Sequence, residues 1–237
     1  MAATFRLRPM RERPEPDVAD SDARVVRALE ELGRPVAHAS IRARARPARF
    51  GPTSMLGGVP HGNRGERWPR ASAGGDPLEH VLQIRVDQLP VVPAALRDTA
   101  VLTLFASTTG EIEIRRAKRL VGLSLLRPPK ERRRPHVHKA LLTWTKKIDY
   151  PDLATAHALL RDAGIETSLG EIERICIEHG LDHASGIKVG GWPTTVADLQ
   201  DDKRFVLQCT EGPFGQMGVC YVFRDPKGRW SASAASY

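Results

Sequence analysis

The sequence predicts an α+β fold of two related antiparallel β units, an internal duplication, with helices at the N-terminus and between the units. Two stretches of short apolar runs separated by turn residues indicate strands, and a region of helical spacing lies between them. Three short blocks also recur in the same order in both stretches. We therefore expect one domain over residues 21–230, with a first β unit at about 41–150, a helical insert at about 151–184 and a second β unit at about 185–230.

The N-terminal residues differ in character from the rest of the chain. Residues 1–20 combine charges with several prolines and are expected to form a flexible arm. A helix is then predicted from about Ser21 to Leu32, because apolar residues recur on one face. Asp20 or Ser21 is the expected N-cap, and Gly33 is the expected stop.

The first β unit is predicted from apolar runs between turn residues. Strands are expected at residues 81–86, 101–105, 112–114 and 140–144.

Two helices are expected to follow the first β unit. The first spans about 152–163, and the second begins with Ser168-Leu-Gly-Glu171, a capping-box pattern, and ends at Gly180. One stripe of the second helix holds Ile172, Ile175, Cys176 and His179. After residue 187 strands are expected again, and residues 231–237 are expected to form an exposed tail.

The duplication is predicted from matched blocks. Gly57-Gly-Val-Pro60 recurs as Gly190-Gly-Trp-Pro193, Val81-Leu-Gln-Ile84 matches Val206-Leu-Gln-Cys209, and Val101-Leu-Thr-Leu-Phe105 matches Val219-Cys-Tyr-Val-Phe223. The order of the blocks is kept while the spacings shorten, as loops shorten more readily than strands.

The same motifs carry a family resemblance. They are Gly57–Pro60, Trp68-Pro69, Gly75–Leu78 and Val81–Ile84 in the first half, with Lys188–Pro193, Gln200, Val206–Gln208 and Gly218–Phe223 in the second. In this order they resemble the YwqG-like family of bacterial proteins, a family of unknown function. The resemblance covers about residues 55–223 and implies a mixed α+β fold of two related antiparallel sheets, without an established chemistry. The basic, proline-rich segment 115–138 departs from the family's pattern.

The chain is basic, with 36 Lys or Arg against 28 Asp or Glu and a net charge of +8. Only eight of the basic residues are lysine, and arginine-rich usage is typical of GC-rich genomes, so part of the charge reflects composition. The clustered arginines are candidates for a basic surface: Arg42, Arg44, Arg46, Arg49, Arg127, Arg132, Arg133 and Arg134. Such clusters can meet phosphates or an acidic protein surface. Aromatic residues are only 5% of the chain and no helix-turn-helix or zinc-finger pattern occurs, which favours a protein partner over nucleic acid.

Four residues are candidates for ligand or partner binding. Gln83 and Gln208 lie inside apolar strands, where a buried amide must find partners. They either satisfy backbone groups of the neighbouring turn or fix a polar ligand in a cleft between the two β units. Trp68 and Trp192 each precede a proline, and they either cover the core or act as recognition aromatics.

No catalytic residue, metal site or cofactor is predicted. His136 and His138 have strand spacing for two metal ligands, but neighbouring arginines would repel a cation. His179 and His183 are separated by the helix-ending Gly180, and no nucleophile elbow occurs. Three cysteines without C-x-x-C spacing fit a reducing compartment, and no apolar stretch is long enough to span a bilayer. We therefore expect a cytoplasmic protein without a membrane partner.

Three functions from different classes remain open. A non-enzymatic protein-binding module, in a specific form an immunity or antitoxin-like protein, is favoured. A basic nucleic-acid-associated protein and a hydrolase with its site between the β units are the alternatives.

Overall fold

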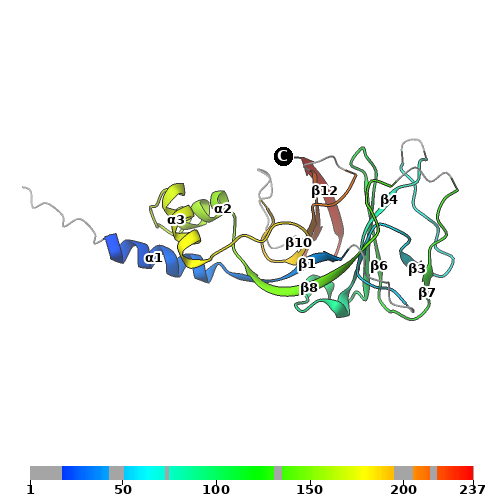
Figure 1. Ribbon diagram of the computed structural model, residues 1–237, viewed down its shortest axis with the longest axis horizontal. Helices are drawn as coiled ribbons and strands as arrows, with labels where there is room; N and C mark the ends of the chain where they lie inside the picture. The colour runs from blue at the N-terminus through cyan, green and yellow to red at the C-terminus, as the bar shows by residue number, and fades with distance from the viewer. Residues whose placement is uncertain are drawn as a thin grey trace, which may run out of the picture.

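The computed structural model describes residues 18–42, 51–72, 75–130, 135–194, 205–213 and 218–236. Within them the fold is α+β, as predicted, with three α-helices and a large antiparallel sheet that curves nearly into a barrel (Figure 1). The helices are α1 (Val18–Glu31), α2 (Leu153–Asp162) and α3 (Leu169–His179). In spatial order the sheet contains β12 (Trp230–Ser236), β11 (Gly218–Arg224), β10 (Phe205–Cys209), β9 (Lys188–Gly190), β1 (Arg34–Arg42), β8 (Ala140–Asp149), β2 (Met55–Leu56), β4 (Glu79–Arg85), β5 (Val101–Ala106) and β6 (Ile112–Ala117).

The three helices form a small unit with its own apolar core. Figure 1 shows them at one end of the long ribbon of β1 and β8, away from the curved part of the sheet. Their contact buries apolar side chains from all three, namely Val25, Leu29, Ala156, Leu160, Ile172 and Ile175. The helical unit is therefore attached to the sheet through β1, β8 and the chain that leads into β9.

Local sequence signals place α2 and α3 well. The Asp152 carboxylate caps α2 by accepting the Thr155 N–H, and the predicted capping box of Ser168 and Glu171 opens α3. Gly180 ends α3 in the left-handed conformation, with φ +63°. His179, expected on the apolar stripe, is exposed.

The start of α1 differs from its prediction. The helix begins at Val18, so the expected cap at Asp20 or Ser21 is wrong. The helix therefore starts three residues before the predicted Ser21. The rest of the predicted arm, residues 1–17, lies outside the described residues.

Strand β1 was not predicted, yet it stands at the centre of the sheet. It pairs antiparallel with β8 along its whole length and with β9 on its other side. The two strand-rich stretches are therefore joined through β1 and β8 into one continuous sheet, whose apolar interior forms the main core.

The two ends of the sheet come close to each other. The Arg116 guanidinium on β6 lies 4.9 Å from the centre of the Trp230 ring on β12, and Arg224 on β11 lies 5.5 Å from it. Asp98 forms ion pairs with Arg224 at 3.0 Å and with Arg116 at 3.7 Å. These contacts hold β6 beside β12 and account for the nearly closed shape.

The C-terminal residues were expected as an exposed tail; Ser231, Ser233 and Ala234 are exposed, but they belong to a strand. Residues Trp230–Ser236 form β12, which pairs with β11 at every position. Alanine and serine have little strand preference of their own, so here the neighbouring strand determines the structure.

A second, two-stranded sheet lies beside the large one. It consists of β3 (His61–Asn63) and β7 (Leu123–Leu125), visible next to β6 in Figure 1. Leu126, directly after β7, packs with Leu78 and Phe105 in a small core. The small sheet is thus fixed to the outer face of β5.

Candidate functional site

Gln83 and Gln208 are fully buried and make matching hydrogen bonds in the two halves. Gln83 Oε1 accepts the N–H of His61, and Gln208 Oε1 accepts the N–H of Thr194. Each of these partners directly follows a Gly-Gly-x-Pro turn. Gln83 Nε2 donates to Thr53 O and Gln208 Nε2 to Gly186 O, in each case four residues before the first glycine of the turn.

This geometry supports the structural alternative for both glutamines. Each amide links the two ends of its own turn by two hydrogen bonds. The donor–acceptor distances are 2.7 Å for both bonds of Gln83 and 2.9 and 3.2 Å for those of Gln208. Every hydrogen bond that either amide makes within the described residues stays in its own half, which weighs against a polar ligand held between the halves.

Substituting either glutamine by alanine is expected to lower the free energy of unfolding by about 2 kcal/mol, because buried backbone groups lose their partners. Urea denaturation of Gln83→Ala and Gln208→Ala would measure both losses. Exposed Gln88 accepts a single backbone N–H, that of Ser54, and provides the comparison: Gln88→Ala removes one such bond instead of two and should cost less. A loss at Gln83 or Gln208 no larger than at Gln88 would contradict the structural role.

The two tryptophans have different surroundings. Trp192 is buried, donates from Nε1 to Leu32 O at 2.8 Å, and has the Arg34 guanidinium 3.4 Å from its ring centre. It joins the helical unit to the sheet and is not available as a recognition aromatic. Trp68 is half-buried, donates from Nε1 to Leu78 O and packs edge-on against Phe105.

The predicted basic surface is described only in part. Arg42, at the end of β1, and Arg127, just after β7, are exposed. The other six predicted arginines lie outside the described residues: Arg44, Arg46, Arg49, Arg132, Arg133 and Arg134. Gln200, named in the family resemblance, also lies outside them.

A buried ionic cluster, not foreseen from the sequence, joins the ends of β8 and β9. Asp149 and Lys188 are both fully buried, with 2.9 Å between Oδ2 and Nζ. The Asp149 carboxylate also accepts the backbone N–H of Ala184 and of Trp192, each at 2.6 Å. The carboxylate thus ties the second Gly-Gly-x-Pro turn to β8.

His183 completes this cluster. Its Nδ1 lies 2.7 Å from Tyr150 O, so Nδ1 carries the proton and donates. Nε2 is then free to accept from Thr194 Oγ1 at 2.9 Å, and it also lies 3.4 Å from Lys188 Nζ. Burial, and after it the charge of Lys188, lowers the pKa of His183, and burial lowers the pKa of Lys188 against the opposing effect of Asp149.

The lowered pKa of His183 predicts a pH-dependent stability. Since the folded pKa lies below the unfolded value, the unfolded chain binds the proton first as the pH falls through about 6.5. We expect the free energy of unfolding to fall between about pH 7 and 5, by up to about 1.4 kcal/mol per pH unit from this one imidazole. Urea denaturation at several pH values would measure it. His183→Gln should make the profile less steep without removing the slope, because burial also lowers the pKa of His38 and of His61. His138→Gln, at an exposed position, should leave the profile unchanged, and equal profiles for the two variants would refute the assignment.

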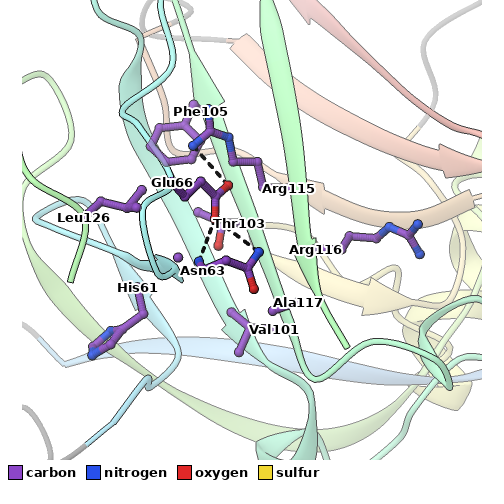
Figure 2. A pocket seen from close by; sticks show the side chains of 11 residues that line it. His61, Asn63, Glu66, Val101, Thr103, Phe105, Arg115, Arg116, Ala117 and Leu126 are labelled. Atoms are coloured by element: carbon purple, nitrogen blue, oxygen red, sulfur yellow. Dashed lines mark hydrogen bonds and ion pairs between the residues drawn. The ribbon is translucent and has the colours of Figure 1, made fainter. Parts of the chain in front are cut away.

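A small hollow lies on the outer face of β5 and β6 (Figure 2). Arg115 crosses it, forming ion pairs with Glu66 at 3.1 Å and Glu113 at 2.6 Å. Glu66 in turn accepts the N–H of Asn63. The cavity volume is about 10 Å³, which is room for roughly one water and far below the roughly 300–1,000 Å³ of ligand pockets. The charged groups of this hollow are paired with one another and link β3 to β6.

His136, one of the two histidines with metal-ligand spacing, contacts a carboxylate. His136 Nδ1 lies 2.8 Å from Glu79 Oε2, while Glu79 Oε1 accepts the Val137 N–H. Within the described ranges no group of three or more potential metal ligands occurs. None of the three described helices has the length and apolar character that a membrane crossing requires.

The most exposed apolar side chains were missed by the sequence reasoning. Leu125 on β7 is 62% exposed, and Val121, just before this strand, is 91% exposed. On α3, Ile177 is 73% exposed. The alternation of Leu123, Ser124 and Leu125 was a usable signal, because it is typical of a strand with one apolar face.

Comparison with known proteins adds no assignment. Neither a scan against protein-family models nor a search of curated proteins finds a match to the chain. The resemblance to the YwqG-like family therefore stays a prediction.

Proposed function

We propose that this protein is a non-enzymatic protein-binding module, with an immunity or antitoxin-like protein as its specific form. The observation that carries the proposal is a pair of exposed apolar side chains at β7: Leu125 lies on the strand, and Val121 lies in the turn before it. Exposed apolar side chains that gather at one place, ringed by polar residues, are typical of interaction surfaces. The hollow beside β3, with room for about one water, gives less support to a small-molecule site.

We also propose that the framework carrying this surface arose by duplication, as the repeated blocks predict. Gln83 pairs with Met55 on β2 and Thr103 on β5, while Gln208 pairs with Lys188 on β9 and Tyr221 on β11. The spatial orders β8-β2-β4-β5-β6 and β1-β9-β10-β11-β12 also correspond strand for strand. The matching hydrogen bonds of Gln83 and Gln208 to their turns support the same origin and lend support to the proposed YwqG-like membership.

Affinity purification from a bacterial lysate, followed by mass spectrometry, tests the protein-binding proposal. We expect a protein recovered in stoichiometric amount with the tagged full-length chain, and its recovery should survive nuclease treatment. Purification at low and high salt separates apolar from purely ionic contacts. Recovery of nucleic acid with steep salt dependence would instead support the nucleic-acid alternative, and absence of any stoichiometric protein would overturn the proposal.

A further inference from the structure

The outer edge of β7 carries backbone groups that are not used within the small sheet. Leu126 N–H donates to Pro60 O across the pair, whereas His61 N–H is turned away from β7 toward Gln83. In an antiparallel pair these directions alternate along each strand. The bonds between β3 and β7 therefore run through Gly62 and Ser124, and the N–H and C=O of Leu123 and Leu125 point to the outer edge. Among the described strands, β7 pairs with β3 alone.

The side chains at this edge are apolar on the exposed face. Alternation places half-buried Leu123 and exposed Leu125 on the same side of β7, and exposed Val121 lies in the turn before the strand. An added strand would set its own side chains directly beside these leucines, and such cross-strand pairs stabilise a sheet.

The exposed charges near this edge that form no ion pair within the described residues are basic. Five exposed basic residues lie close in sequence to the ends of β3 and β7, namely Arg64, Lys118, Arg119, Arg127 and Lys130, and none forms an ion pair within the described part of the chain. The nearby carboxylates are already engaged, Glu66 by Arg115 and Glu79 by His136. A complementary partner would thus bring negative charge to both ends of β7.

We propose that β7 binds an extended segment of a protein partner, which adds as a strand to the outer edge and has an apolar middle between acidic ends. This inference rests on the proposed function and specifies its surface and the chemistry of its partner. Main-chain bonds to Leu123 and Leu125 supply affinity, while the leucines and the basic residues select the sequence.

The test uses a labelled synthetic peptide of about nine residues, with alternating valine and threonine between two pairs of glutamates. Fluorescence anisotropy gives its affinity for the full-length chain, and amide NMR shifts locate it. We expect shifts at Leu123 and Leu125, and binding at least about tenfold weaker for the same peptide with lysine in place of glutamate. Leu125→Pro should bind more weakly than Leu125→Ala, since both lose the side chain but only proline lacks the outward N–H. Ile177→Asp on α3 is the matched control and should bind normally.

Several results would overturn the inference. They are equal binding of the lysine peptide, equal affinities for Leu125→Ala and Leu125→Pro, shifts confined to other strands, or a duplex DNA that shifts the same amides with equal affinity. Failure of the peptide while affinity purification still yields a stoichiometric protein rejects only the β7 edge. Failure of that purification rejects the proposed function itself.

Discussion

Replacing Asp149 by alanine is expected to lower the free energy of unfolding by about 3–5 kcal/mol. The Asp149 carboxylate is fully buried. It forms an ion pair with the Lys188 ammonium and accepts hydrogen bonds from the N–H groups of Ala184 and Trp192. Its removal leaves a buried cation and two buried donors without their partner, and the uncompensated charge is the largest cost. Urea denaturation followed by circular dichroism would measure the loss.

A second variant separates the charge from the rest of the cluster. Met55 pairs with Gln83 as Lys188 pairs with Gln208, so methionine is a fitting apolar replacement at position 188. In Asp149→Ala with Lys188→Met the buried cation is gone, and we expect most of the lost stability to return. Asp162→Ala, at an exposed position on α2, should change stability by less than about 0.5 kcal/mol. If Asp149→Ala alone also changed the free energy of unfolding by less than about 0.5 kcal/mol, the ion pair would not stabilise the junction.

The matched turns are the part of the fold that the sequence predicts best. The blocks around Gly57 and Gly190 and the two glutamines are local patterns, and a buried amide within an apolar strand has few alternatives to bonding the nearest turn. Capping of α2 and α3 is equally local and is confirmed by the side chains of Asp152 and Ser168.

The largest errors arise from pairing between distant segments. Strand β1 acquires its conformation from β8 and β9, and β12 from β11, although neither sequence has a strong strand pattern. The bond between Asp149 and Lys188 joins residues 39 positions apart, and no spacing rule connects them. The β7 edge was missed for a related reason, because its exposure depends on which strands the sheet leaves unpaired.

Substituting Gly191 by alanine is expected to be nearly as costly as losing the carboxylate, about 3–5 kcal/mol. Gly191 has φ +75°, and a Cβ there would meet Asp149 Oδ2, with Cβ and Cγ of Asp149 each 3.0 Å away. The alanine would push the carboxylate away from the Trp192 N–H and from Lys188, and it would also bear the strain of the left-handed backbone. Thermal and urea denaturation would measure the loss.

Gly110 provides a matched control, because its φ is +86° and nothing lies within 4 Å of an added Cβ. Gly110→Ala should therefore cost only the backbone term, about 1–2 kcal/mol. Any additional loss of stability in Gly191→Ala, beyond that in Gly110→Ala, measures the contact with Asp149. In an Asp149→Ala background the loss caused by Gly191→Ala should therefore approach that caused by Gly110→Ala. If the two substitutions at positions 149 and 191 were simply additive, the glycine would serve the turn alone. The second Gly-Gly-x-Pro motif would then have no part in positioning the buried Asp149 carboxylate.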